Sequence, residues 1–257
     1  MIWWAGFAVL GLMTRLWLCS IYVKNVSIVD KFGGVGCVLA TLVYTLHVEI
    51  LYTRMLIVFL LVIVWGLRLS VHLMIRNHGK GEDYRYREFR QRYGAHCYWW
   101  FSFFQVFLLQ GVLVLIISSP QLGVAIETQS NTLNIIDYIG LFVWTVGFVF
   151  EAVGDWQLTV FKRDPANKGK LLTTGLWRYT RHPNYFGDAA VWWGFGILAI
   201  ASGAYWYSIG SVIMTYLIIK ISGVAMLEKS LVQKKPGYEE YIHRTSAFMP
   251  WFPKKKT

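Results

Sequence analysis

The chain has 257 residues, of which 56% are hydrophobic and only 15% are charged. Because a soluble domain usually carries about 25% charged residues, this composition excludes an ordinary soluble globular protein. The 13 tryptophans, 15 tyrosines and 16 phenylalanines lie in long apolar stretches, which is typical of a bundle of membrane helices. We therefore expect an all-α integral membrane protein with one polytopic domain over residues 1–257.

Apolar windows of about 20 residues, the length needed to cross a bilayer, predict about seven transmembrane helices. Their expected ranges are 2–23, 34–52, 55–76, 99–118, 136–160, 185–202 and 204–226. The start of the first range has no basic segment of the kind that precedes a cleaved secretory signal, so we expect this helix to stay in the membrane.

The positions of the 25 lysines and arginines indicate the orientation of these helices. Two lie in 24–31, six in 76–98, six in 162–181 and seven from Lys229 to the end of the chain. Since cytoplasmic loops are enriched in cations, these segments are expected on the cytoplasmic side. The N-terminus then lies outside and the C-terminus lies in the cytoplasm.

Neither nucleic acid nor a metal is expected as a partner. The net charge of +11 resides in loops that flank membrane helices rather than on one basic domain, which indicates lipid headgroups or a phosphorylated cofactor. Cys19, Cys37 and Cys97 have no spacing typical of a disulfide framework or a zinc site, so we predict neither.

Several charged residues fall inside the expected spans, where a charge costs about 2.5–3.5 kcal/mol. They are Arg15, Glu49, Arg68, Glu151, Asp155 and Lys220. Such residues usually face a polar interior. Glu151 and Asp155 are four residues apart and share one helical face, so they either bind a ligand or pair with Arg68 or Lys220.

Residues 80–93 combine basic residues with aromatic residues at helical spacing, namely Tyr86, Phe89 and Tyr93. This pattern favours a helix that lies in the membrane interface. The alternative is a lid that closes over an anionic cofactor.

The stretch 175–188 is the most informative part of the chain. Pro183 suits the first turn of a helix, whose N-terminus favours an anion, and Arg178, Arg181 and, when protonated, His182 lie beside it. Asn184 and Asp188 are four residues apart and offer amide and carboxylate contacts to a ribose or a nicotinamide. These residues predict a cofactor cavity that opens to the cytoplasm and holds a polar, anionic ligand.

The run 181–188, Arg-His-Pro-Asn-Tyr-Phe-Gly-Asp, resembles the R-H-x-N-Y-x-G-D motif of membrane sterol reductases, with Trp177 at the position of their preceding Trp. The stretch 157–165 resembles their Q-x-x-x-F-[KR]-x-x-P pattern. Over nearly its full length the chain is similar to steroid 5-alpha-reductase-like proteins of the DUF1295 type, on the segments 27–30, 76–85 and 238–250. The resemblance implies that the C-terminal part, 130–253, binds the cofactor.

The same superfamily contains isoprenylcysteine carboxyl methyltransferases, whose R-H-P-x-Y motif binds S-adenosylmethionine, so the resemblance leaves two cofactors open. Asn184 with Asp188, and the cations Lys162 and Arg163, which suit a 2′-phosphate, favour NADPH. The chain has no G-x-G-x-x-G motif, so a nucleotide would have to bind without a Rossmann domain.

The resemblance implies an NADPH-dependent oxidoreductase that reduces a carbon–carbon double bond in a sterol-like or other apolar lipid. Alternatives are methyl transfer from S-adenosylmethionine to an isoprenoid or lipid carboxylate, and non-catalytic lipid binding. The candidate proton donors are Tyr185, Asp30 and Glu49. The candidate cofactor-binding residues are Asp155, Lys162, Arg163, Trp177, Arg181, His182, Asn184, Tyr185, Asp188 and Glu228, the last of which resembles the acidic residue in the reductase and methyltransferase tails.

Two membranes are consistent with this sequence. The terminal Lys254-Lys255-Lys256-Thr257 fits a dilysine retrieval signal, which would place a eukaryotic protein in the endoplasmic reticulum. In a bacterium the same residues form a basic tail at the cytoplasmic face of the inner membrane.

Overall fold

A computed structural model describes residues 1–222, 224, 228, 231–232 and 235–254. Parts of the expected span 204–226, Lys229, and Lys255 and Lys256 of the basic end lie outside the described residues. The chain divides into two compact units, which are described separately. Unit 1 comprises Met1–Leu133 with Ser202–Tyr207, and unit 2 comprises Asn134–Ala201 with Ser208–Thr257.

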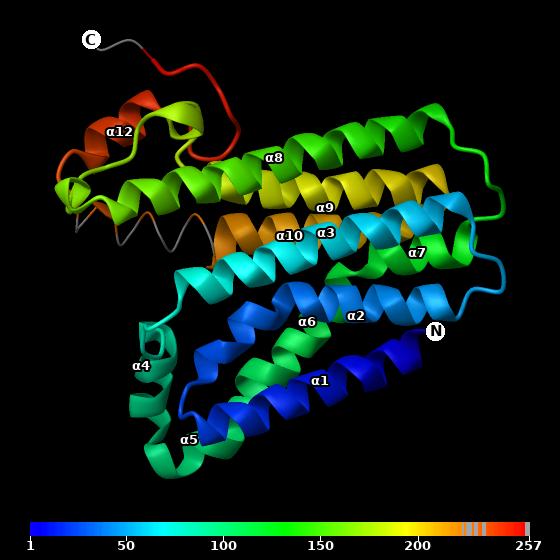
Figure 1. Ribbon diagram of the computed structural model, residues 1–257, viewed down its shortest axis with the longest axis horizontal. Helices are drawn as coiled ribbons and strands as arrows, with labels where there is room; N and C mark the ends of the chain where they lie inside the picture. Colours follow the sequence, from blue (N-terminus) through cyan, green and yellow to red (C-terminus); the bar gives the residue numbers. More distant parts are fainter. Residues whose placement is uncertain (223, 225–227, 229–230, 233–234, 255–257) are drawn as a thin grey trace. The chain divides into compact units, whose positions relative to one another are not determined.

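Unit 1 is helical throughout. Its elements are α1 (Ile2–Tyr22), η1 (Val26–Phe32), α2 (Gly33–Leu46), α3 (Thr53–Arg76), α4 (Tyr84–Tyr93), α5 (Ala95–Ser102), η2 (Phe103–Leu108), α6 (Leu109–Ile117) and α7 (Ser119–Glu127), and η5 (Tyr205–Ser208) begins in it. Helices α2 and α3 lie side by side (Figure 1). A Cβ atom on Gly34 would lie 2.4 Å from the Gly66 carbonyl oxygen, so only glycine permits this approach.

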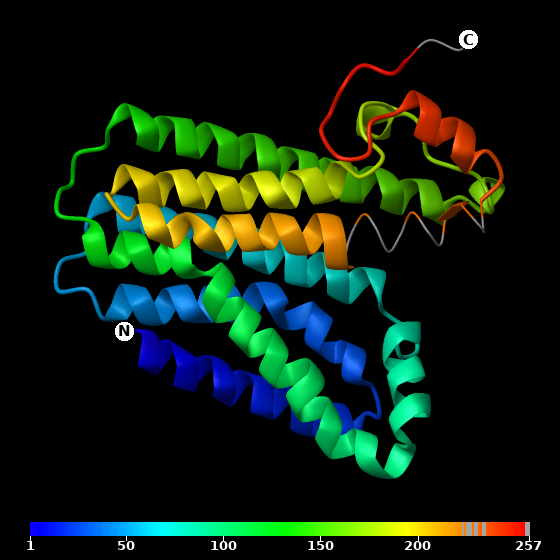
Figure 2. The same cartoon turned by 180° about the vertical axis from the view of Figure 1, so that it is seen from behind.

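Unit 2 is built on the long helix α8 (Ile135–Arg163) and the helix α9 (Pro183–Ala201). Its other described elements are η3 (Pro165–Asn167), η4 (Gly175–Arg178), α10 (Ile209–Tyr216), η6 (Leu217–Ser222) and α12 (Tyr238–Arg244). Helices α8, α9 and α10 run beside one another in both views (Figures 1 and 2). Asn134 and Asp137 form a capping box that fixes the start of α8.

Each of the helices α8 and α9 carries glycines at intervals of seven residues. These glycines allow the two helices to pack backbone to backbone. A Cβ atom on Gly147 would lie 2.5 Å from the Val191 backbone nitrogen. A Cβ atom on Gly187 would lie 2.3 Å from the Glu151 backbone nitrogen. Because both obstacles are backbone atoms, neither can move aside cheaply. This close pair of helices positions the residues at the start of α9 against the second half of α8.

Within the residues that the structure describes, five helices are long and apolar enough to cross a membrane, and they correspond to the first five expected spans. They are Ile2–Tyr22, Val26–Leu46, Thr53–Arg76, His96–Ile117 and Ile135–Arg163. The expected span at 185–202 forms α9, which is not among these five; ten of its 19 residues are buried within the protein, so it need not be apolar on every side. The last expected span forms the shorter apolar helix Tyr205–Ile221.

The charged residues within the expected spans take two kinds of position. Glu151 and Asp155 are buried at 3% and 6% exposure, as expected for carboxylates that face a protein interior. Arg15 and Lys220 are exposed instead. Glu49 lies in an exposed turn, since α2 ends at Leu46 rather than near residue 52.

Candidate functional site

The segment before α9 is the centre of a buried polar cluster in unit 2. Thr180, Arg181 and His182 are each no more than 6% exposed. Pro183 occupies the first position of α9, as the sequence predicts. The Thr180 hydroxyl donates to the Phe248 carbonyl at 2.9 Å, so the C-terminal segment holds this turn in place.

Arg181 joins this turn to the C-terminal part of the chain. Its Nε and Nη2 lie 2.8 and 2.7 Å from Glu228 Oε1, and its Nη1 donates to the carbonyls of Ile242 and Thr245. These bonds direct the guanidinium into the protein. Arg181 is therefore suited to positioning Glu228 and His182 rather than to contacting a cofactor phosphate directly.

His182 lies between Glu228 and Tyr185. Its Nε2 is 3.3 Å from Glu228 Oε1, and its ring stacks on that of Tyr185 with centroids 5.7 Å apart. Burial holds the pKa of His182 below its usual value, against the opposing effect of the Glu228 carboxylate. The imidazole is therefore neutral at pH 7, and its orientation is fixed by one carboxylate and one aromatic ring.

Helix α8 contributes the opposite wall of the cluster. Asn184 donates its side-chain amide to Asp155 Oδ1 at 3.1 Å. The indole of Trp177 donates to the Gly154 carbonyl at 3.2 Å. These contacts bring together residues that lie up to 30 positions apart in the sequence, and they join α8 to the turn and the first residues of α9.

Two residues that the sequence analysis did not single out hold the turn η4 in place. Gln157 accepts a hydrogen bond from the Leu176 backbone N–H at 3.1 Å, directly after Gly175, whose φ of +61° favours glycine. Tyr241 donates its hydroxyl to the Trp177 carbonyl, and burial raises its pKa, which keeps the hydroxyl protonated. Gln157 belongs to the recognised Q-x-x-x-F pattern, whereas no sequence signal indicates the pairing of Tyr241 with Trp177.

The remaining cofactor candidates lie around this cluster in unit 2. Lys162 and Arg163 occupy the last turn of α8 and are exposed. Asp188 lies one turn after Asn184 in α9 and is partly buried. Along α8, the exposed cations Lys162 and Arg163 therefore come after the buried polar residues of that helix.

The two other candidate proton donors, Asp30 and Glu49, belong to unit 1. Asp30 accepts from the Tyr86 hydroxyl at 2.7 Å and from Arg85 Nη2 at 3.1 Å. These bonds fasten α4 to η1, so Asp30 has a structural role in unit 1, and they hold α4 against the body of that unit. The interface and lid interpretations of α4 both stay predictions.

The chain is similar to one protein family and to known proteins of two fungi, as follows. The family model described as "Protein of unknown function (DUF1295)" matches residues 16–245. A protein of Schizosaccharomyces pombe named "Uncharacterized protein C594.04c" is 26% identical over 267 residues, which cover 91% of this chain and 75% of that protein. No solved structure matches the chain.

A second relative carries a functional name. "Probable O-methyltransferase ustE" of Ustilaginoidea virens is 42% identical over 111 residues. The match covers 43% of this chain and about a third of that protein, 34%. The family match spans most of the chain and includes the whole segment from Asp155 to Glu228. The chain therefore belongs to the DUF1295 family.

Proposed function

We propose that this chain is a membrane enzyme that uses NADPH to reduce a carbon–carbon double bond in a sterol-like or other apolar lipid. Support comes from the arrangement of polar groups along α8. Asp155, which bonds Asn184, and Lys162 are seven residues apart, so they share one face of the helix. The rise between them is about 10 Å.

This arrangement matches the two ends of a phosphorylated dinucleotide. The Asn184 amide and the Asp155 carboxylate suit the polar edges of a nicotinamide or a ribose, and Lys162 with Arg163 suits a 2′-phosphate. S-adenosylmethionine has no phosphate, so it gives these exposed cations no comparable partner. This difference is the observation that carries the proposal.

The residues of the cluster would have separate roles. Asn184 and Asp188 orient the bound ring, and Trp177 fixes the turn that covers the second half of α8. Glu228 and Arg181 hold His182 in one orientation. NADPH, when bound, supplies the hydride.

Reduction of an enone also requires a proton donor or hydrogen-bond donor at the developing enolate oxygen. Tyr185 is the candidate donor that lies in unit 2, directly after Asn184, and its ring is held by His182. We therefore assign this role to Tyr185 in preference to Asp30 or Glu49. An apolar lipid substrate would reach the site from the hydrocarbon core that surrounds the long helices.

A second candidate function is methyl transfer from S-adenosylmethionine to an isoprenoid or lipid carboxylate. The relative named a probable O-methyltransferase favours it, and so does the Arg181-His182-Pro183-x-Tyr185 run. Methyl transfer accounts for the buried polar cluster as well as NADPH-dependent reduction does. It does not explain the cations at the end of α8.

The orientation is part of the same proposal. With the cation-rich segments in the cytoplasm, the N-terminus lies outside and the cofactor cavity opens to the cytoplasm, in a bacterial inner membrane or the endoplasmic reticulum. Protease accessibility of tags placed at each end in sealed vesicles tests this orientation.

The decisive experiment measures the thermal stability of the detergent-purified full chain with NADPH, NADH or S-adenosylmethionine. A ligand at a hundred times its Kd stabilises the folded state by about 2.7 kcal/mol. We expect NADPH to raise the Tm, and we expect NADPH oxidation with enone or sterol substrates. A rise with S-adenosylmethionine alone would contradict the reductase and support the methyltransferase.

A further inference from the structure

Unit 2 contains an open cavity of about 350 Å³ between the loop that precedes α9 and the C-terminal helix α12. Its wall consists of Leu171, Thr173, Arg178, Gly237, Glu240, Tyr241, Arg244, Thr245 and Pro253. None of these residues is among the candidate site residues discussed above except Tyr241 and Thr245, which contact that cluster. The volume lies within the range of small-molecule sites, about 300–1,000 Å³.

The cavity adjoins the motif cluster through two shared residues. Tyr241 lines the cavity and donates to the Trp177 carbonyl, and Thr245 lines it and accepts from Arg181. A ligand in the cavity would therefore contact the residues that hold Trp177 and Arg181 in place. This continuity makes the cavity an extension of the candidate site within unit 2.

Hydrogen bonds on both sides tie together the chain segments that carry the cavity wall. Lys235 Nζ donates to the Lys170 carbonyl at 3.1 Å at one end of the loop. At the other side, the Lys254 N–H donates to the Arg244 carbonyl at 2.9 Å and holds the segment that carries Pro253. The cavity is therefore bounded by chain segments that are tied to one another.

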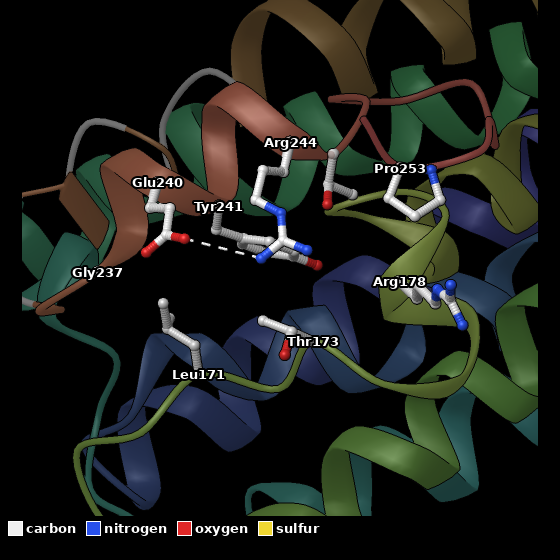
Figure 3. A pocket seen from close by; sticks show the side chains of 9 residues that line it. Leu171, Thr173, Arg178, Gly237, Glu240, Tyr241, Arg244 and Pro253 are labelled. Atoms are coloured by element: carbon white, nitrogen blue, oxygen red, sulfur yellow. Dashed lines mark ion pairs between the residues drawn. The ribbon is translucent and has the colours of Figure 1, made fainter. Parts of the chain in front are cut away.

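The charged groups of the wall are two arginines and one carboxylate. Figure 3 shows Arg244 reaching from α12 toward Thr173, with Leu171 at one end of the loop wall and Arg178 at the other. Glu240 pairs with Arg244 across one helical turn at 3.7 Å, and both side chains are about half exposed. Such an exposed pair contributes little stability, so Arg244 is available to a stronger anion.

We infer that this cavity binds the adenosine diphosphate portion of the nucleotide cofactor. Arg178 and Arg244 pair with the diphosphate, the Thr173 hydroxyl donates to it, and Leu171 with Pro253 offers apolar surface to the base. The inference rests on the proposed function, because only a dinucleotide places a diphosphate beside the Arg181 cluster. It gives Arg178, a cation of the stretch 175–188, a specific partner, and it adds Arg244, which no motif indicates, to cofactor binding.

The test uses the full chain in detergent and titrates ADP, inorganic pyrophosphate and adenosine by calorimetry. We expect ADP to bind more tightly than pyrophosphate or adenosine. Arg244→Gln and Arg178→Gln should each weaken ADP binding about tenfold, whereas Lys168→Gln, which removes an exposed cation of the same loop outside the cavity wall, should not. Glu240→Gln should tighten ADP binding, because it releases Arg244 from its competing carboxylate.

Two results would overturn the inference. One is an ADP affinity that is the same in the Arg178→Gln, Arg244→Gln and Lys168→Gln variants; the other is a wild-type chain that binds none of the three probes. If NADPH still binds and is oxidised in either case, the proposed function stands and only the cavity assignment falls. Binding of S-adenosylmethionine without NADPH would overturn the proposed function and with it this occupant of the cavity.

Discussion

Glu228 Oε1 accepts a hydrogen bond from Arg181 Nε, forms an ion pair with its Nη2 and lies 3.3 Å from His182 Nε2, so one carboxylate oxygen holds two adjacent residues of the motif. Arg181 is 6% exposed, and its cation is therefore largely removed from water. A buried cation needs a partner, because its desolvation is not otherwise offset. Glu228 thus links the C-terminal part of the chain to the start of α9.

Glu228→Gln should lower the stability of the protein, because it leaves the buried Arg181 without an opposite charge while keeping the shape of the side chain. We expect a loss of about 1–3 kcal/mol, less than for a fully buried pair since Glu228 is partly exposed. The readout is the Tm in detergent. Glu239→Gln, at an exposed position of α12, is the matched control and should change stability by about 0.5 kcal/mol or less. Equal Tm values for the two variants would show that the Arg181–Glu228 pair is not structurally important.

His182 should make stability fall on acidification. Its pKa in the folded chain lies below the unfolded value of 6.5, so the unfolded chain binds the proton first as the pH drops. The stabilisation from the neutral imidazole is complete above pH 6.5 and is lost as the pH falls through the folded pKa. We expect His182→Asn to flatten the stability–pH curve in this window.

His243→Asn provides the control for that measurement, because His243 is exposed on α12 in the same unit. Thermal unfolding of the wild type and both variants between pH 5 and pH 8, about the range in which histidine titrates, separates the contributions. If His243→Asn flattens the curve as much as His182→Asn does, the effect does not come from the buried imidazole.

Much of the helical content could be predicted from the sequence, because the length of an apolar stretch is a strong local signal. A helix start at Pro183 and a helix within 80–93 follow from local patterns and are confirmed by α9 and by α4, which covers 84–93. The helix α7 has only nine residues and therefore gives no span-length signal, so hydropathy places its region between two expected spans. Glu49 was placed inside a span because hydropathy windows do not detect where a helix ends.

The candidate site was predictable only in part. The motif indicates Arg181, His182 and Asn184, and the i, i+4 spacing indicates that Asp155 lies on one face with Glu151. That Arg181 points into the protein toward Glu228 depends on how the chain returns after α10, which no local pattern encodes. The cavity beside α12 likewise depends on tertiary contacts such as that of Tyr241 with Trp177.

Gly147→Ala should destabilise the protein because its added methyl group would lie 2.5 Å from the Val191 backbone nitrogen. Overpacking of this kind costs about 1–3 kcal/mol, and it would separate α8 from α9 and so displace Asn184 from Asp155. The Tm in detergent measures the loss. Gly81→Ala is the control, since nothing lies within 4 Å of its added methyl group. A Gly147→Ala variant as stable as the control would mean that α8 and α9 are not in backbone contact.

The double substitution Lys162→Gln with Arg163→Gln should reduce the affinity for NADPH but leave the affinity for NADH unchanged. These exposed residues end α8, and a charge-assisted contact to a 2′-phosphate contributes about 1.5–3 kcal/mol, or about tenfold or more in Kd. NADH has no 2′-phosphate, so it provides an internal control. Lys168→Gln provides a second control, because it removes a neighbouring exposed cation.

This prediction can be checked without knowing the lipid substrate. NADPH and NADH are each titrated into the wild type, the double variant and the Lys168→Gln variant. Equal weakening of NADPH and NADH would indicate a general effect on the end of α8 rather than contact with the 2′-phosphate. Unchanged NADPH binding would remove Lys162 and Arg163 from the site. Arg178 and Arg244 are assigned to the diphosphate, which NADPH and NADH share, so Arg244→Gln should weaken the binding of both nucleotides alike, whereas the double variant should weaken the binding of NADPH alone.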